Sequence, residues 1–236
     1  MKLDKSELKA DRNALALVFD SETTGTKEPM AIIEAAYLEL DEQFNVVGEF
    51  RQLYDPGMPI SFGTMSAHHI MQSEVDGQQP AAEFVLPDAK YVIGHKVDFD
   101  MDAIKYKGDI KRICTLAIAR KHLPEVDSHT QSALMYYFEG PSARERLRGA
   151  HSALVDVQNC YRLLGHLQNV MDTKGIPTDT LEQLWAESER CRIPDIFDFG
   201  KHKGEKIADV PWSYRSWCMK QADMDPYLHK AIMATL

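Results

Sequence analysis

The apolar residues of this chain occur first in short runs and later at helical spacing. Three runs, at residues 14–20, 30–40 and 46–56, combine β-branched and other apolar residues and are separated by turn residues. This pattern predicts three consecutive strands in an antiparallel meander. A further short run predicts a strand at 91–95, and residues 113–123 predict a strand that passes into a helix.

Helical spacing dominates the rest of the chain. Short helices are expected at 63–71, 80–86 and 128–138. A polar loop rich in Gly, Pro and Arg is expected at 139–151, followed by a long amphipathic helix at 152–173 with Ser152 as its N-cap. Strands that come first and then alternate with helices predict a mixed α/β layer fold.

The chain changes character near residues 173–180. We expect a main domain over 1–175, a linking helix over 176–190 and a small C-terminal module over 191–236. Residues 190–236 hold eight Lys/Arg and six Asp/Glu, a net charge of +2, so the total of -9 leaves -11 for residues 1–189. A length of 236 residues has room for one medium domain and a small appendage.

Composition limits the class of protein. A net charge of -9 excludes a protein that coats nucleic acid by charge alone, but not an enzyme that meets phosphate through bound cations. The charged first residues do not form a signal peptide, and no apolar stretch approaches the roughly 20 residues that cross a membrane. Four cysteines without a CxxC pair predict structural thiols in a reducing compartment. We therefore expect a cytoplasmic protein.

Two carboxylates follow the first apolar run. Asp20 and Glu22 are two residues apart, so in a strand both side chains project from the same face. Adjacent like charges are best tolerated with a cation between them. An isolated pair of this kind also fits a solvated strand end.

More acidic residues come later in the chain. Asp98, Asp100 and Asp102 follow the strand expected at 91–95, where a helix starts and its dipole also favours acids. His151 precedes the long helix and Asp156 lies inside it. Five helical residues turn through about 500°, which would leave the two side chains about 140° apart. We therefore expect His151 on the preceding loop and Asp156 on the helix.

The ordered set of motifs resembles one family. "DSETTG" at 20–25, "HKVDFD" at 95–100 and "HSALVDV" at 151–157 resemble the motifs of the DEDDh 3′-5′ exonucleases, over about residues 14–173. The resemblance implies a ribonuclease H-like mixed sheet flanked by helices. The segments "ICTLAIARKHLP" and "FGKHKGEKIADVPWSYRSW" resemble, more loosely, the exodeoxyribonuclease X branch of this family.

The resemblance also implies a mechanism. Asp20, Glu22, Asp100 and Asp156 would bind two divalent ions, Mg²⁺ or Mn²⁺, and His151 would act as the general base. Oxygen ligands suit these cations, and the sequence shows no Cys/His cluster that would indicate zinc. The expected reaction is hydrolysis of single-stranded DNA, or of frayed DNA 3′ ends, to nucleoside 5′-monophosphates.

By the same resemblance, the terminal nucleotide would contact residues after the first acid pair, in a short helix and beside the second motif. For Met65 and Phe99 core packing is a competing explanation, while the "MSAHHI" match favours a binding role for His68. The expected set is Thr23, Thr24, Met65, His68 and Phe99.

The chain departs from the family pattern near the site. Ser21 replaces the usual Thr, and Lys96 stands where Asn is usual, so a cation there could pair with a metal-binding acid or a phosphate. Asp98 and Asp102 add charge near the site and are further candidate ligands.

Basic residues elsewhere suggest paths for a nucleic acid. Arg144, Arg146 and Arg148 could line the access to His151, or belong to a solvated loop. In the tail, basic and aromatic residues fit either a single-strand binding surface or a small packing module; they are Lys201, Lys203, Lys206, Trp212 and Trp217.

Two alternatives to a DNA exonuclease stay open. RNA is a possible substrate, because recognition of the 2′-OH depends on the shape of the pocket. A nucleic-acid binding protein on an inactive nuclease scaffold is the other, although all four acids and His151 are retained.

Overall fold

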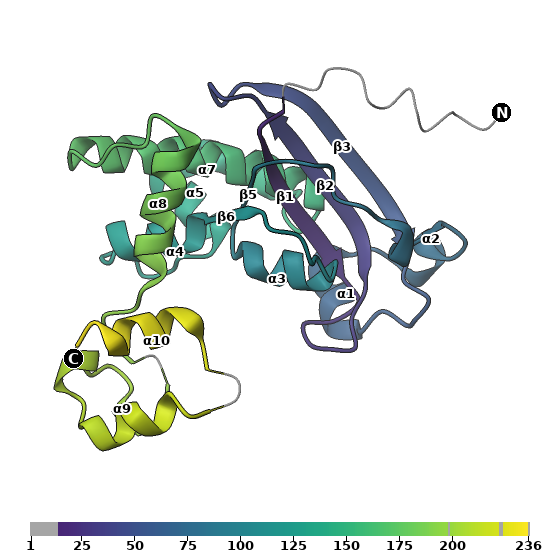
Figure 1. The fold of residues 1–236 in the computed structure, drawn as a ribbon. Helices are drawn as coiled ribbons and strands as arrows, with labels where there is room; N and C mark the ends of the chain where they lie inside the picture. Colours follow the sequence, from purple (N-terminus) through teal and green to yellow (C-terminus); the bar gives the residue numbers. More distant parts are fainter. Residues whose placement is uncertain (1–13, 198, 222–223, 236) are drawn as a thin grey trace.

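One mixed sheet forms the centre of the protein. The computed structural model describes residues 14–197, 199–221 and 224–235 (Figure 1). Neighbouring strands follow the order β4-β3-β2-β1-β5-β6. The first three strands pair antiparallel, whereas β5 pairs parallel with β1 and β6 pairs parallel with β5, which confirms the predicted meander and mixed sheet. The strands are β1 (Ala16–Thr23), β2 (Ile32–Leu40), β3 (Val46–Asp55), β4 (Gln79–Pro80), β5 (Tyr91–Gly94) and β6 (Lys111–Cys114).

Helices connect and cover the strands. In the described residues they are α1 (Phe62–His68), α2 (Gln72–Val75), α3 (Val97–Ala103), α4 (Thr115–His122), α5 (Gln131–Glu139), α6 (Arg144–Leu147), α7 (Ala153–Thr173), α8 (Leu181–Arg192), α9 (Trp212–Cys218) and α10 (Pro226–Met233). The expected long helix at 152–173 is confirmed as α7, and the strand passing into a helix at 113–123 as β6 and α4.

Two segments differ from the sequence prediction. Residues 80–86 are not a helix but the end of β4 followed by one 3₁₀ turn, Ala81–Glu83. Pro80 and Pro87 flank this segment, and a residue before proline disfavours helical backbone. The expected loop at 139–151 instead contains a 3₁₀ turn, Gly140–Ala143, and the short helix α6, because its Arg and Glu residues are good helix formers.

The centre of the sheet, formed by β1, β2 and β5, is buried on both faces, whereas β3 and β4 are largely exposed or half-buried. Ala16 and Val18 of β1 belong to one apolar cluster with residues of α7, whereas Leu17 and Phe19 belong to a second cluster with residues of α3. Every residue of β2 is buried. A strand between two helical layers therefore fixes the direction of each side chain at its end, which is where the first acid pair lies.

The helix α8 packs on this main core, while the C-terminal residues have a core of their own. Leu181, Leu184 and Cys191 of α8 join the cluster that includes α7. A separate cluster contains Phe197, Ile207, Val210, Cys218, Leu228, Ala231 and Ile232. The C-terminal residues lie apart from the sheet beyond the end of α8 (Figure 1). No helix in the described parts of the chain is long and apolar enough to cross a membrane.

Candidate active site

Asp20 and Glu22 lie on the face of β1 that carries Ala16 and Val18, toward α7. Burial and the nearby Asp100, Asp156, Glu22 and Glu34 raise the pKa of Asp20 well above its usual value. Burial and the nearby Asp156, Glu34 and Asp100 raise the pKa of Glu22 to about 9. The fold thus brings the predicted acids close enough for each to disfavour the charge of the next.

Asp100 reaches the site because β5 and α3 pack closely against β1. A Cβ atom on Gly94, at the end of β5, would lie 3.1 Å from the Phe19 carbonyl oxygen and 3.1 Å from Val97 Cβ, so a side chain there would require its neighbours to shift by a few tenths of an ångström. The Asp100 carboxylate is buried, and its Oδ1 accepts hydrogen bonds from Ser21 N at 3.0 Å and Ser21 Oγ at 2.9 Å. Burial nevertheless raises the pKa of Asp100 to about 7.

His151 and Asp156 lie where the sequence predicts them. Asp156 is in the first turn of α7, and His151 is an exposed residue on the preceding loop, with a positive φ of 68°. The backbone N of His151 donates to Asp156 Oδ2 at 2.9 Å, which fixes the loop to the helix. Burial raises the pKa of Asp156, and the hydrogen bond from His151 opposes that shift.

Sequence analysis missed a fifth carboxylate, Glu34 on β2. It pairs with Glu22 across the two strands and is fully buried. Its Oε1 accepts a hydrogen bond from Arg51 Nε, and its Oε2 accepts one from the backbone N of Ala153 at 2.8 Å. Glu34 is one of two acids in the apolar run "AIIEAAYLEL", and an acid in such a run was the available signal, because a buried charge requires partners.

Glu34 also changes how α7 begins. Ser152 is the N-cap residue, as predicted, but its side chain makes no capping hydrogen bond. The free N–H of Ala153 bonds instead to Glu34 from the neighbouring strand. A carboxylate at a helix N-terminus is favourable because it meets unpaired N–H groups and the positive end of the helix dipole. Glu34 therefore ties the helix that carries Asp156 to the sheet that carries Glu22.

Two more residues support the site and were not predicted. Gln131 Nε2, on α5, donates to the Asp156 backbone oxygen at 3.0 Å and to Asp156 Oδ1 at 3.3 Å. The ring of His95 bonds to Thr115 Oγ1 at 3.0 Å and to the His129 carbonyl oxygen at 2.9 Å. Burial lowers the pKa of His95 to about 4, so its imidazole is neutral and has a structural role at the end of β5.

The acids fit a divalent metal centre. Ligand atoms of Glu22, His151 and Asp156 all lie within 4.8 Å of one another. Burial raises the pKa of each acid, and repulsion by nearby carboxylates adds to the shifts of Asp20, Glu22 and Asp156. Lys96 lowers the pKa of Asp100 without cancelling the effect of burial. A group of carboxylate oxygens in this state is suited to a hard cation such as Mg²⁺ or Mn²⁺. Divalent metal centres held by carboxylates commonly activate water for hydrolysis.

The residues expected to contact a nucleotide are mostly engaged within the protein. Thr23 Oγ1 donates to the Gly25 carbonyl oxygen at 2.8 Å. Thr24 Oγ1 accepts from Ala31 N at 3.1 Å, and the Thr24 carbonyl oxygen accepts from Ser61 N at 2.9 Å, which joins the end of β1 to α1. Met65 packs beside an apolar cluster that includes Ile33, in line with the packing alternative.

His68, Phe99 and Phe62 are the remaining candidates for contact with a nucleotide. Burial lowers the pKa of His68; its Nδ1 accepts from Ile70 N at 2.9 Å, while its buried Nε2 has no hydrogen-bond partner. An unpaired buried nitrogen is costly unless a ligand completes it. Phe99 packs against the cluster around α3. Phe62, which sequence analysis did not select, begins α1 with a ring that is 87% exposed.

The residues at which the chain departs from the family pattern have different surroundings in the structure. Lys96 has a positive φ of 76°, and its Nζ lies 5.2 Å from the centroid of the Phe99 ring. Asp98 forms ion pairs with Arg112 at 3.0 Å and Arg192 at 2.6 Å, which leaves it poorly placed to compete for a metal. Asp102 is exposed on α3. Ser21 supplies the donors to Asp100.

The three arginines before His151 differ from one another. Arg146 pairs with Glu139, and Arg148 pairs with Glu145 at 2.9 Å. Arg144 is exposed and forms no ion pair with a described residue. Of the three, Arg144 is therefore the one whose charge is available to a ligand.

A second group of possible metal ligands joins α4 to α8, although the sequence showed no Cys/His cluster. His122 Nε2 lies 2.6 Å from Glu187 Oε1, and Cys191 Sγ lies 3.2 Å from the same oxygen. Although burial opposes it, hydrogen bonds from Arg190, His122 and Cys191 lower the pKa of Glu187 to about 2. Burial raises the pKa of Cys191 to about 12. The group is thus a satisfied hydrogen-bond network rather than a free metal site.

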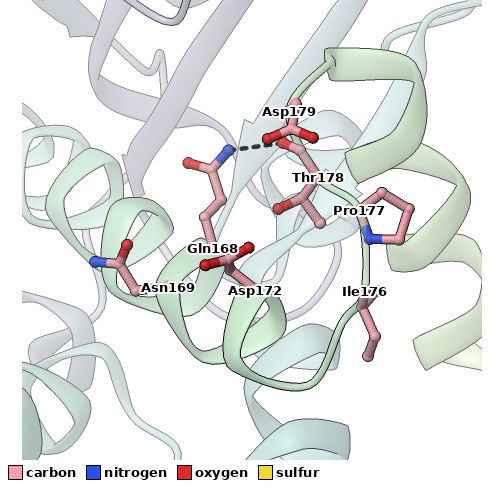
Figure 2. A pocket seen from close by; sticks show the side chains of 7 residues that line it. All are labelled: Gln168, Asn169, Asp172, Ile176, Pro177, Thr178 and Asp179. Atoms are coloured by element: carbon pink, nitrogen blue, oxygen red, sulfur yellow. Dashed lines mark hydrogen bonds between the residues drawn. The ribbon is translucent and has the colours of Figure 1, made fainter.

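A polar hollow of about 310 Å³ lies at the other end of α7 (Figure 2). Gln168 on its wall donates to the Thr178 carbonyl oxygen at 2.9 Å. Gln168 is twelve residues beyond Asp156, or about 18 Å along the helix at 1.5 Å per residue. The hollow is therefore separate from the acids. Its lining is Gln168, Asn169, Asp172, Ile176, Pro177, Thr178 and Asp179.

Sequence comparisons point to one class of protein. A profile of the family described as exonuclease (RNase_T) matches residues 17–164. Exodeoxyribonuclease 10 of Escherichia coli strain K12 is 27% identical over 219 residues, which cover 89% of this chain and 94% of that protein. A PolC-type DNA polymerase III of Lacticaseibacillus paracasei is 30% identical over 132 residues, which cover 50% of this chain and 9% of the polymerase.

Solved structures show the same fold. Exonuclease X in complex with 5′ overhanging duplex DNA superposes with a TM-score of 0.55 at 23% identity, covering 72% of this chain and 99% of that chain. Escherichia coli exonuclease I in complex with a dT13 oligonucleotide gives a TM-score of 0.55 at 18% identity, covering 68% of this chain and 42% of the other. These likenesses confirm the predicted ribonuclease H-like sheet flanked by helices.

Proposed function

The chain belongs to the exonuclease family and is a nuclease, and we propose that it removes nucleotides one at a time from the 3′ ends of DNA. The single observation that carries this proposal is the assembly of Asp20, Glu22, Asp100 and Asp156 around one site with His151 beside them. The relative in Escherichia coli is named an exodeoxyribonuclease, which supports DNA as the substrate.

Asp20, Glu22, Asp100 and Asp156 would hold two Mg²⁺ or Mn²⁺ ions. When bound, such ions lower the pKa of water and stabilise the charge on the leaving 3′ oxygen. Ser21 and Gln131 keep Asp100 and Asp156 in place through neutral hydrogen bonds, which leave the carboxylate charge for the cations. Glu34 holds the helix beneath them.

His151 is the proposed general base. Its loop is fixed through the backbone bond to Asp156, while its side chain is exposed and free to meet a water molecule at the phosphate. Imidazole is the most frequent general base in enzymes, so it can take the proton of the attacking water and release it to solvent.

The end of the strand would lie between β1, α1 and α3. The unpaired His68 Nε2 would donate to the sugar or phosphate of the terminal nucleotide, and the exposed Phe62 ring would stack on a base. Thr23, Thr24 and Met65 would shape this pocket, with Phe99 beside Asp100. Stacking tolerates every base, which suits a degradative enzyme.

The test uses single-stranded DNA and matched RNA, labelled at the 3′ or the 5′ end, with Mg²⁺, Mn²⁺ or EDTA. We expect metal-dependent release of mononucleotides from DNA 3′ ends. Asp20→Ala should lower the rate at least about 100-fold, whereas Asp102→Ala, an exposed acid on α3, should leave it unchanged.

Other outcomes decide between the alternatives. Faster cleavage of RNA would make the protein an exoribonuclease of the same family. Binding of both nucleic acids without cleavage in any metal would contradict the enzyme proposal and favour an inactive scaffold. Release from 5′ ends would contradict the proposed polarity.

A further inference from the structure

The C-terminal residues expose aromatic rings although they have an apolar core in which rings could be buried. Phe197 is fully buried in that core, yet Trp212 is 45% exposed and Trp217 is 52% exposed. Large aromatic side chains gain most from burial, so exposed tryptophans on a small unit require a specific explanation.

Cations lie beside these rings. Lys201 Nζ is 5.3 Å from the centroid of the Tyr214 ring, and Arg215 Cζ is 5.5 Å from that of Trp212. The rings of Tyr214 and Trp217 are themselves 5.6 Å apart. Residues 199–221 hold five Lys/Arg and two Asp/Glu, a net charge of +3 in a chain whose total is -9.

The lysines of this region are available to a ligand. Lys201, Lys203 and Lys206 are exposed, and no carboxylate among the described residues forms an ion pair with them. The nearest acid in sequence, Glu205, pairs with His202 at 3.0 Å. Unpaired cations interleaved with rings favour a polyanion with flat bases over an apolar protein partner.

The loop that carries the lysines is built against α9. Gly200 has a positive φ of 68°, and a Cβ atom there would lie 2.3 Å from the Tyr214 hydroxyl oxygen. Gly204, with a φ of 88°, donates from its N to the Phe197 carbonyl oxygen at 2.7 Å. The backbone of this loop is therefore fixed, and Lys201 lies beside the Tyr214 ring before any ligand binds, which reduces the entropy lost on binding.

This surface is not used to join the two parts of the protein. Tyr227 of α10 donates to Glu189 of α8 at 2.7 Å, and Lys121 of α4 pairs with Asp195. The helix α9 lies on the side of the C-terminal residues away from α8 (Figure 1). We define the aromatic-basic face as the contacting side chains Lys201, Tyr214 and Trp217.

We propose that the aromatic-basic face binds single-stranded nucleic acid and holds the strand whose end the nuclease site hydrolyses. This inference rests on the proposed function for the identity of that strand. A base would stack on Trp217 beside Tyr214, and Lys201 would meet a phosphate. The face would keep a long substrate attached between successive cleavages without selecting a sequence.

Binding is tested on the full chain with Asp20→Asn, in EDTA, so that neither cleavage nor a bridging cation contributes. Fluorescence anisotropy would follow a labelled oligothymidylate of about 20 nucleotides. The double change Trp217→Ala with Lys201→Ala should weaken binding about tenfold and reduce its salt dependence. The matched control is Met233→Ala with Lys230→Ala, an exposed apolar residue and a cation on α10, and it should bind as before.

Cleavage by the protein with Asp20 intact provides the second readout. The face variant should degrade a substrate of about 5 nucleotides at the normal rate but should release a long strand after fewer cleavages. Equal binding by the face variant, or equal loss in the α10 control, would overturn the inference. Salt-sensitive binding through the face in a protein that never cleaves would contradict the nuclease proposal and support this one.

Discussion

At the scale of single residues, the site is a group of buried acids with few compensating charges. Ser21, Gln131 and the His151 backbone contribute neutral donors to Asp100 and Asp156. Among the described residues, neither of these two acids forms an ion pair with a lysine or arginine. Glu34 differs because Arg51 pairs with it, so it acts as a fixed support for the helix rather than as a free ligand.

Removing Glu34 should therefore damage the support of the site. Glu34→Ala leaves Ala153 N without its partner and Arg51 without its counter-ion, and we expect a loss of about 2 to 4 kcal/mol in the free energy of unfolding. Because α7 carries Asp156, we also expect nuclease activity to fall about 10- to 100-fold. Urea unfolding and cleavage rates, measured at a temperature where the variant is folded, check both effects.

Glu34→Gln is the informative companion. Its amide oxygen can still accept the Ala153 hydrogen bond, so we expect it to recover most of the activity lost in Glu34→Ala. If both variants lose equal activity while remaining folded, the charge of Glu34, rather than its bond to α7, would be what matters.

Sequence reasoning identified the acids and the histidine that folding brings together, because they belong to motifs with regular spacing. The positions of Asp20, Glu22, Asp100, Asp156 and His151 follow from three motifs, although their direct metal contacts are still proposals. Sequence reasoning missed Glu34 and Gln131, because their partners are 119 and 25 residues away in the chain and no local pattern relates them. Such pairs become visible when the sheet register and helix packing are known.

At the scale of elements, the junction of β5 and α3 decides where Asp100 lies. Periodicity predicted β1, β2, β3, β5 and α7 because each buries a regular set of apolar positions. It failed at residues 80–86, where the segment is too short for its apolar residues to distinguish a helical turn from extended chain. The precise approach of α3 to β1 depends on the missing side chain of Gly94, which periodicity does not measure.

Gly94→Ala should move α3 away from β1. The added Cβ would lie 3.1 Å from both the Phe19 oxygen and Val97 Cβ, so we expect a destabilisation of about 1 to 3 kcal/mol and lower activity through Asp100. Thermal unfolding and cleavage assays measure the two effects.

Gly165→Ala is the matched control, because Gly165 is an exposed position within α7 with nothing within 4 Å of its added Cβ. Alanine there should stabilise the protein by about 0.5 to 1 kcal/mol. A Gly94→Ala variant as stable and active as the wild type would show that α3 adjusts freely.

At the scale of the whole molecule, folding gathers acids from three distant segments and raises their pKa values. An acid with a raised pKa favours the protonated folded state. Its contribution to stability is complete below the unfolded pKa of about 4 and is lost as the pH rises through the folded value. For Asp100 that value is about 7, and for Glu22 it is about 9. Without metal, these acids should therefore lower stability progressively between about pH 4 and pH 9.

Divalent cations should reverse this loss, because they bind the deprotonated carboxylates. At pH 8.5 we expect Mg²⁺ or Mn²⁺ at about 10 mM to raise the Tm by a few °C relative to EDTA. At pH 5.5 the rise should be much smaller. Scanning calorimetry at both pH values checks this. A metal-induced shift that is the same at both pH values would contradict the proposed ligands.

Glu22→Gln provides the internal control for that experiment. It removes a buried acid that the folded state must keep protonated at pH 8.5, where the unfolded chain ionises it. Its Tm at pH 8.5 in EDTA should therefore exceed that of the wild type, while its response to Mg²⁺ should shrink. A lower Tm in EDTA would show that burying this acid does not cost stability at that pH.

The separate apolar cluster of the C-terminal residues has a consequence for how the protein can diverge over time. The main core contains none of its side chains, and polar pairs such as Tyr227 with Glu189 join the two parts. Selection can therefore act on the proposed strand-binding face and on the nuclease site independently. A descendant could acquire a new preference for long or short strands by changes around α9 alone, while inheriting its carboxylates unaltered.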